Sequence, residues 1–320
     1  MKRLFLGLMF LLIIVVAALS VYVASRQHLT FDVPMPAVTA STDSAVVERG
    51  HYVVRTLASC PICHGNPKHY DRTMAGEEVP LSGGFEFKIP PGAFYPRNIT
   101  PDDETGIGKF SDGQIARALR NSVGNDGRAL LPFMEMQGLS DEDLVAVVSY
   151  LRSQPPVYHV VPAHQPNLLG RIVMATALAN PVGPKSTPPQ RSPHGANVEN
   201  GRYLVESVAN CWACHSQRDY NTGAMVGPHL GGADMPDDRN PKRTWAPPNL
   251  TSDPTTGRLA RFSEDQFIAR LRAGRAIPGS PMPWQGLKNM NEEDIRAIYR
   301  YLKTLPAVVH DTGPAFVDKS

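Results

Sequence analysis

The chain has 320 residues and a nearly balanced charge, with 32 Lys and Arg residues against 30 Asp and Glu residues. That balance gives no indication of a nucleic-acid-binding surface, which would require a marked excess of basic residues. The apolar fraction of 42% is typical of a globular protein, and the length suffices for about two domains of ordinary size.

Residues 1–26 are predicted to form a membrane anchor. Two basic residues precede an apolar run from Leu4 to Ala24, and a helix of this length would span about 31 Å, which matches the hydrocarbon core of a bilayer. The basic residues are expected to stay in the cytoplasm, which places the rest of the chain outside. A signal peptide cleaved near Ala18 or Ser20 is the alternative. In both cases the chain is exported, and we expect a single N-terminal span in the bacterial inner membrane with the remaining residues in the periplasm.

The sequence after the anchor repeats itself. Asn98-Ile99-Thr100 corresponds to Asn249-Leu250-Thr251 with an offset of 151 residues (249 − 98). A period this long indicates a duplicated domain, because solenoid repeats are at most about 50 residues long. The expected organisation is a linker at 27–44, domain one at 45–157, an interdomain linker at 158–196, domain two at 197–310 and a tail at 311–320. Within the interdomain linker, Leu168–Ala179 is predicted to be a short helix packed between the domains, since it is too short to span a bilayer.

Both domains are predicted to be all-α with long covering loops. In domain one a helix over 47–59 leads to the first cysteine pair, another begins at Ser111 with a capping box completed by Gln114, and the last begins near Ser140. The apolar positions expected in the core are Ile115, Ala118 and Leu119 in the second helix and Leu144, Val147, Val148 and Leu151 in the last. Domain two repeats this arrangement, with a capping box at Ser263 and Gln266 and with Ile295, Ile298, Tyr299 and Leu302 in the last helix. One hairpin strand is predicted at Phe85–Ile89.

All four cysteines fall in two motifs of the form Cys-x-x-Cys-His. They are Cys60-Pro61-Ile62-Cys63-His64 and Cys211-Trp212-Ala213-Cys214-His215. This pattern is typical of covalent haem c attachment, in which two thiols form thioethers and the adjacent histidine binds the iron. A redox pair, a disulfide and half of a zinc site are the alternatives, but zinc ribbons bring their cysteine pairs within about 20 residues of each other. The sequence therefore predicts two covalently bound haem c groups.

The second axial ligand is predicted to be methionine in both domains. Aligning the two Gln-Gly-Leu segments, 137–139 and 285–287, places Met134 opposite Met282. Met136 is the alternative in domain one. The predicted iron ligands are His64, Met134, His215 and Met282, and the predicted cofactor-binding residues are these four with Cys60, Cys63, Cys211 and Cys214. The histidines at 51, 69, 159, 164 and 229 are interpreted as surface or loop residues.

Two segments carry a specific resemblance. Residues 98–112 and 199–205 are similar to the cytochrome c subunits of membrane-bound bacterial alcohol and gluconate dehydrogenases. The resemblance covers about 45–310 and implies class I cytochrome c domains, in which the first and last helices cross near Gly50 and Tyr150 and near Gly201 and Tyr301. It also implies the histidine and methionine ligands given above. The chain departs from that pattern in having two haem sites where those subunits carry three, in its N-terminal anchor, and in Glu135 where a proline usually follows the ligand methionine.

The resulting hypothesis is an electron-transfer subunit without catalytic residues of its own. It would accept electrons from a periplasmic or membrane dehydrogenase, or a quinol-oxidising partner, and deliver them to a terminal oxidase or a soluble cytochrome. The alternative is a dihaem redox enzyme acting directly on a small substrate, either peroxidase-like or thiosulfate-oxidising. Such an enzyme would require an open coordination position at one iron, which the two methionines argue against.

Overall fold

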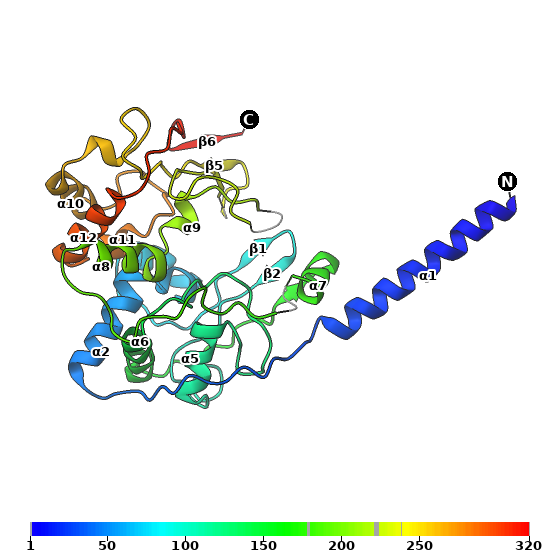
Figure 1. The fold of residues 1–320 in the computed structure, drawn as a ribbon. Coiled ribbons are helices and arrows are strands. Elements are labelled where there is room, and N and C mark those ends of the chain that lie inside the picture. The colour runs from blue at the N-terminus through cyan, green and yellow to red at the C-terminus, as the bar shows by residue number, and fades with distance from the viewer. Residues whose placement is uncertain (1, 178–179, 221–223, 238, 320) are drawn as a thin grey trace.

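The computed structural model describes residues 2–177, 180–220, 224–237 and 239–319. Helix α1, Lys2–Arg26, extends away from a globular part that contains the rest of the described chain (Figure 1). No residue of α1 is buried. It is the one described helix that is long and apolar enough to cross a membrane. Its composition and its exposure fit a membrane anchor, and a signal sequence would have the same features.

The segment at 27–44 is packed against the globular part. The Phe31 N–H donates to the Gly127 carbonyl at 2.8 Å, and the Ala40 N–H donates to Asp112 Oδ2 at 2.7 Å. The segment ends at Asp43, whose carboxylate caps the next helix by accepting from the Ala45 N–H at 2.8 Å. The linker therefore holds α1 at a defined position on the globular part.

The globular part is mostly helical and consists of two halves, which we call the first half (45–157) and the second half (197–310). They share the order helix, π-helix, short cysteine-motif helix, two strands and two longer helices, and differ in the short helices between these elements. The elements from α2 to the interdomain segment are α2 (Ser44–His51), the π-helix η1 (Tyr52–Leu57), α3 (Pro61–His64), η2 (Pro67–His69), α4 (Tyr70–Ala75), β1 (Phe87–Ile89), β2 (Gly92–Phe94), α5 (Asp112–Asn121), α6 (Asp141–Ser153), β3 (Gln165–Pro166) and α7 (Leu168–Ala175). Those that follow are α8 (Val198–Tyr203), the π-helix η3 (Leu204–Val208), α9 (Trp212–His215), β4 (Met235–Pro236), β5 (Arg243–Trp245), η4 (Leu259–Arg261), α10 (Glu264–Arg272), α11 (Trp284–Leu287), α12 (Glu292–Leu302) and β6 (Phe316–Asp318).

Each half is accompanied by a small antiparallel sheet, which the all-α expectation did not include. The sheets have the orders β1-β2-β3 and β4-β5-β6. The predicted hairpin strand at Phe85–Ile89 corresponds to β1, which pairs with β2 through Phe87 opposite Phe94. The third strands, β3 and β6, come from segments beyond the expected domain bounds of 157 and 310. The sheets thus tie the interdomain segment and the C-terminal tail to the two halves.

The first and last helices of each half cross at a glycine. A Cβ atom added to Gly50 would lie 1.9 Å from the Ala146 carbonyl oxygen of α6, and one added to Gly201 would lie 2.0 Å from the Ala297 carbonyl oxygen of α12. Only glycine permits such close backbone contact. These are the crossings that the family resemblance implied.

The predicted helix starts are confirmed, but the buried face of one helix differs from the prediction. Ser111 and Ser263 both form capping boxes with the glutamine three residues later. In α5, Ile115 is buried, whereas Ala118 and Leu119 are only half-buried and two arginines, Arg117 and Arg120, are buried instead. The arginines are tolerated there because their guanidinium groups donate to backbone carbonyls, such as that of Gly124 at 2.6 Å.

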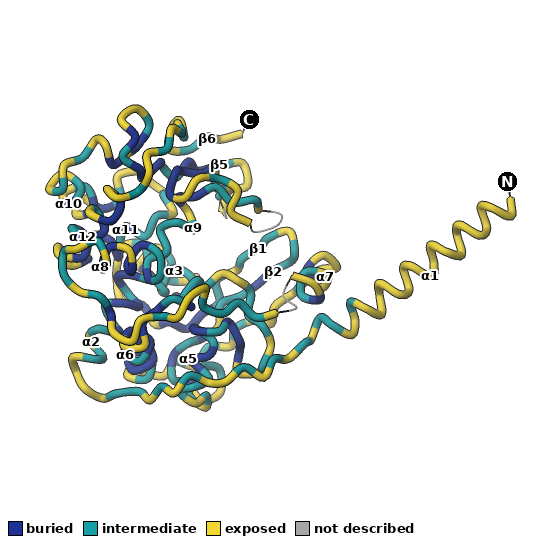
Figure 2. Tube along the Cα trace, in the orientation of Figure 1, coloured by how far each residue is buried: buried dark blue, intermediate teal, exposed yellow. Residues whose placement is uncertain are grey.

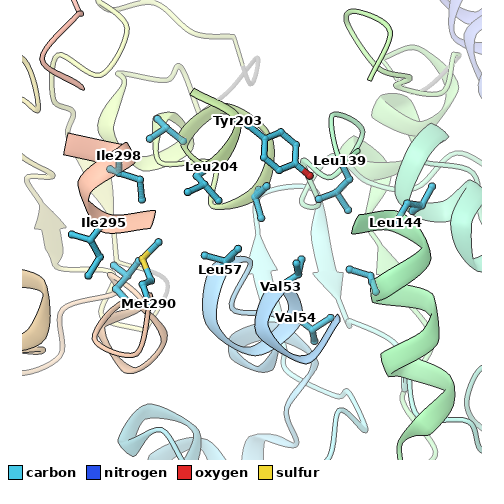
Figure 3. Packing of buried hydrophobic residues seen from close by; sticks show 14 of the residues in the cluster. Val53, Val54, Leu57, Leu139, Leu144, Tyr203, Leu204, Met290, Ile295 and Ile298 are labelled. Atoms are coloured by element: carbon cyan, nitrogen blue, oxygen red, sulfur yellow. The ribbon is translucent and has the colours of Figure 1, made fainter. Parts of the chain in front are cut away.

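The hydrophobic core is continuous across the two halves. Buried residues alternate with exposed ones throughout the globular part, whereas α1 is exposed along nearly its whole length (Figure 2). Figure 3 shows that Leu57 of the first half and Met290 and Ile295 of the second half belong to one buried cluster. The halves are therefore not separated by solvent.

Two tyrosines join the halves by reciprocal hydrogen bonds. Tyr52 donates to Asp294 Oδ2 at 2.8 Å and accepts from the Asn291 N–H at 2.9 Å, at the start of α12. Tyr203, the counterpart of Tyr52 in the repeat, donates to Asp143 Oδ2 at 2.7 Å, at the start of α6. Burial, followed by the neighbouring carboxylate, raises the pKa of both phenols, so each remains a hydrogen-bond donor at physiological pH.

The same aspartates also bind the first helix of their own half. Arg49 forms a two-pronged ion pair with Asp143 at 2.7 and 2.9 Å, and Asn200 donates to Asp294 at 3.0 Å. Each aspartate therefore connects three elements. Both aspartates also lie in the first turn of the last helix of their half, where carboxylates suit the helix dipole.

Candidate haem sites

Both cysteine motifs follow a π-helical turn. After η1 the chain passes through Ser59, with φ at 52°, and the Cys60 N–H donates to the Val54 carbonyl at 2.9 Å. After η3 it passes through Asn210, with φ at 48°, and the Cys211 N–H donates to the Val205 carbonyl at 3.0 Å. Such turns are often found at functional sites. The turns place the short helices α3 and α9, which contain the histidines, at the same position in each half.

Each candidate histidine is held by a backbone carbonyl. His64 Nδ1 lies 2.9 Å from the Arg97 carbonyl oxygen, and His215 Nδ1 lies 2.8 Å from that of Pro248, one repeat later. A carbonyl can only accept, so Nδ1 carries the proton and Nε2 presents its lone pair, as an iron ligand must. Burial lowers the pKa of both imidazoles, which favours the neutral form required for ligation.

The thiols suit covalent attachment better than a disulfide, a redox pair or a zinc site. None of the four cysteines, all of which lie in the described part of the chain, forms a disulfide. Burial raises the pKa of the Cys60 thiol to about 11 and that of Cys211 to about 12, unlike the depressed pKa of a redox-active thiol. Among the described residues no group of three or more His, Cys, Asp or Glu could hold a metal ion, which argues against a zinc site. The residues present therefore fit haem c, with one pair of thiols and one oriented imidazole at each site.

The repeated asparagine motif supports these histidines. Asn98 Nδ2 donates to the Val157 carbonyl at 2.8 Å, and its Oδ1 accepts from the Thr100 N–H at 3.0 Å. Asn249 makes the corresponding bonds to Val308 and Thr251. The carbonyls that accept from His64 and His215 belong to Arg97 and Pro248, which directly precede these asparagines. The bonds of each asparagine therefore fix the position of the carbonyl that orients the histidine.

Two further histidines form a repeated pair that the sequence interpretation missed. His159 Nδ1 lies 2.8 Å from the Ser82 carbonyl oxygen, and His310 Nδ1 lies 2.8 Å from the Gly231 carbonyl oxygen. The two histidines are related by the offset of the asparagine motifs (310 − 159 = 151), and their acceptors lie at nearly corresponding places in the loops (231 − 82 = 149). Each of these histidines binds the loop that passes the candidate haem histidine of its own half. In the first half the Gly83 N–H, on that loop, donates to the His64 carbonyl at 2.7 Å. His159 is thus a repeated structural residue, and the comparison of His159 with residue 310 would have identified it.

The candidate methionines lie on loops that contact the opposite half. Met136 and Met282 pack against the hydrophobic core, whereas Met134 is half-buried on the preceding part of its loop. The next residue, Glu135, accepts a hydrogen bond of 2.8 Å at its carbonyl from Asn210 of the second half. Further along the same loop, a Cβ on Gly138 would meet Ser207 Oγ at 2.7 Å. On the corresponding segment of the second half, a Cβ on Gly286 would lie 2.5 Å from the Thr56 carbonyl oxygen, so the conformation of each loop depends on the other half.

A cavity of about 190 Å³ lies between the halves beside the first motif. Its lining includes Cys63 and Met74 from the first half and Trp245 and Pro281 from the second. In its lining the Arg239 guanidinium carbon lies 3.2 Å from the centre of the Tyr70 ring, a cation–π contact across the halves. Met74, which corresponds to Met225 at the repeat offset of 151, is not among the predicted ligands, yet the structure places it next to the first candidate site.

Comparison with known proteins shows a cytochrome c domain in the second half. Residues 198–306 match the family model of cytochrome c. The chain is 30% identical over 303 residues to the cytochrome c subunit of the alcohol dehydrogenase (quinone) of Gluconacetobacter polyoxogenes, which covers 89% of this chain and 61% of that protein. It is 32% identical over 290 residues to the gluconate 2-dehydrogenase cytochrome c subunit of Pantoea cypripedii, covering 83% and 60%. A diheme cytochrome c-type protein of Cereibacter sphaeroides is 25% identical over 258 residues, covering 78% and 82%.

The chain spans about three-fifths of the length of the first two of these relatives. The resemblance predicted from residues 98–112 and 199–205 is confirmed. The chain contains a cytochrome c domain at 198–306 and is similar, over most of its length, to the cytochrome c subunits of bacterial dehydrogenases.

Proposed function

We propose that each half is a class I cytochrome c domain that binds one haem c. The first site consists of Cys60, Cys63 and His64 with Met134, and the second of Cys211, Cys214 and His215 with Met282. The domains extend over 45–157 and 197–310, each with the third strand of its sheet added. In this arrangement haem supplies one-electron chemistry at iron.

The observation that carries this proposal is the duplicated histidine arrangement. In both halves the histidine directly follows a cysteine pair and is oriented through Nδ1 by a backbone carbonyl, at 2.9 Å and 2.8 Å. A single such arrangement also occurs in structural histidines. Its recurrence one repeat later, after the same π-turn and the same cysteine spacing, favours two equivalent ligand sites.

We infer that the protein is an electron-transfer subunit. It receives single electrons from a periplasmic or membrane dehydrogenase and delivers them to a terminal oxidase or a soluble cytochrome. The names of the similar proteins, which are cytochrome subunits of dehydrogenases, support the class of donor. The chain's own contribution is rigid placement, because the tyrosine–aspartate bonds between the halves keep the two candidate sites in one fixed arrangement. We further propose that α1 remains as a single span and holds both domains in the periplasm, at the inner membrane.

The first test is the haem content of the full-length protein. Pyridine haemochrome analysis should give two covalently bound haems per chain. Replacing Cys60 and Cys63 by serine should remove one haem, and the same change at Cys211 and Cys214 should remove the other. One haem in the unmodified protein would contradict the two-domain proposal.

A second test separates a carrier from an enzyme. The purified protein should be reduced rapidly by a quinoprotein or flavin dehydrogenase with its substrate, and should show no turnover with peroxide or thiosulfate alone. A Met134→Ala variant would remove the proposed second axial ligand of the first site and so open that coordination position. If unmodified protein turns over peroxide or thiosulfate by itself, the carrier proposal fails.

A further inference from the structure

The interdomain helix α7 lies in an unexpected place. The sequence predicts that it packs between the domains, but the structure places it beside the globular end of α1 and against the β1–β2–β3 sheet (Figure 1). Arg26, the last residue of α1, donates from Nε to the Ala175 carbonyl at the last residue of α7, at 3.3 Å. This bond fixes the C-terminal end of α7 beside the C-terminal end of α1.

The orientation of α7 is set by one glycine. A Cβ on Gly170 would lie 2.2 Å from the Pro91 carbonyl oxygen, so this side of α7 is pressed against the β1–β2 hairpin. Leu168 and Ile172 lie on the opposite side, because residues two positions from Gly170 are rotated by about 200° around the helix axis. They follow the i, i+4, i+7 spacing with Ala175, whose end of the helix meets α1. The stripe therefore runs along the side that adjoins the anchor.

The first turns of α7 present exposed apolar side chains, whereas Ala175, at the end that meets α1, is buried. Leu168, Leu169 and Ile172 are 72, 48 and 39% exposed. The exposed Arg171 on the same helix and the half-buried Arg26 add positive charge beside it. Tyr22, under Arg26 with its ring centre 5.3 Å from the guanidinium carbon, is at the level where aromatic and basic residues mark a membrane interface. An apolar helix face flanked by basic residues suits the boundary between headgroups and acyl chains.

We propose that α7 is a second membrane contact, which lies in the outer interface of the bilayer beside α1 and inserts Leu168, Leu169 and Ile172 among the lipids. The protein is then held at two points. α1 prevents release from the membrane, and α7 fixes how the first half faces the membrane surface. This inference goes beyond electron transfer and rests only on α1 remaining in the bilayer, so it does not depend on haem content.

The test uses the full-length protein alone in nanodiscs made from phosphatidylcholine and phosphatidylglycerol, with a trace of phospholipid that carries a photoreactive diazirine on the acyl chain near the glycerol. After irradiation, adducts are mapped by peptide mass spectrometry. Adducts are expected on α1 and on 168–175, and not on the helices of the second half. Absence of adducts from 168–175 while α1 is labelled would overturn the proposal and would favour a protein partner on this face. An intact mass that lacks α1 would overturn it as well.

Matched variants sharpen this test. Leu168→Glu combined with Ile172→Glu should reduce labelling of α7 several-fold, while α1 remains labelled. Val309→Glu, at an apolar residue of the second half that is 78% exposed, should leave the labelling of α7 unchanged. Because a variant can misfold, hydrogen exchange of the unmodified protein provides an independent measurement. The backbone amide hydrogens of α7 should exchange more slowly when the protein is in nanodiscs than when it is in detergent whose concentration is lowered stepwise. Equal exchange rates in the two conditions would refute lipid contact.

Discussion

Removal of Arg49 is predicted to be the most destabilising single change at the junction of the two halves. Its partner Asp143 has no exposed surface, and the Arg49 side chain is 23% exposed. Arg49→Ala leaves the Asp143 carboxylate with uncharged donors only, among them Tyr203. Breaking a buried ion pair in this way costs about 3–5 kcal/mol.

The second half provides a matched control for this change. Asn200 occupies the position equivalent to Arg49 and donates a single hydrogen bond of 3.0 Å to Asp294. Asn200→Ala should cost only about 1–3 kcal/mol, because it removes an uncharged donor that serves Asp294, which is 8% exposed, and the Gly195 carbonyl at 3.0 Å. The two substitutions are equivalent in fold position but differ in charge. The difference between the two losses of unfolding free energy therefore measures how much the charge of the Arg49–Asp143 ion pair contributes to stability.

The assay is equilibrium unfolding of the haem-loaded protein by guanidinium chloride in a fixed concentration of mild detergent, followed by haem absorbance and by far-ultraviolet circular dichroism. Coincident curves are needed before a free energy is extracted. The double variant Arg49→Ala with Asp143→Asn should regain much of the unfolding free energy lost in Arg49→Ala. Both charges of the ion pair are then absent, so no unpaired charge remains buried. If Arg49→Ala costs less than Asn200→Ala, or if Asp143→Asn gives no recovery, the buried ion pair does not have this stabilising role.

Three other outcomes follow from the described geometry. Met134→Ala should abolish the red charge-transfer band of methionine-ligated ferric haem in the first site while Met136→Ala retains it, and the reverse result would assign the ligand to Met136. Gly201→Ala should destabilise the protein by about 2 kcal/mol or more, since its Cβ would overlap a carbonyl of α12, whereas Gly183→Ala, which meets no atom within 4 Å, should be neutral in the same unfolding assay. Hydrogen bonds from the following threonines lower the pKa of Asp253 to about 2, below its unfolded value, so its contribution to stability should be present above about pH 4 and be lost as the pH falls toward 2. An acid titration of Asp253→Asn should lack that part of the transition, and an unchanged titration would contradict the assignment.

The features that could be predicted from the sequence depend on short-range chemistry. The two motifs at 60–64 and 211–215 need only five residues, and the capping boxes at Ser111 and Ser263 need four. Helix starts therefore agreed with the structure to within a few residues. The duplication added information that a single copy lacks. Because the same residue types recur at a constant offset, the two asparagine motifs could be recognised as equivalent from the sequence alone.

Features that depend on distant contacts could not be predicted in this way. Tyr52 and Asp294 are 242 residues apart, and nothing in the local pattern of either indicates the other. The buried Arg120 has the sequence of a solvated helix face, but the Leu139 carbonyl and other acceptors that accommodate its guanidinium come from a later loop and from the start of α6. The predicted position of α7 was wrong for a related reason, since α7 contacts α1, and the bond between Arg26 and Ala175 joins residues that are 149 positions apart.

The reciprocal tyrosine–aspartate contacts have the form of a symmetric homodimer interface, in which residue i of one subunit meets residue j of the other and j meets i. Joining two such subunits in one chain replaces a concentration-dependent association by an intramolecular one with a high effective concentration. Once the pairing no longer depends on identical surfaces, the two copies are free to diverge. Arg49 against Asn200 and Glu135 against Pro283 are differences of that kind, and they lie beside the contacts that hold the halves together. A chain built in this way can adjust one candidate redox site while the other, and the geometry between them, is preserved.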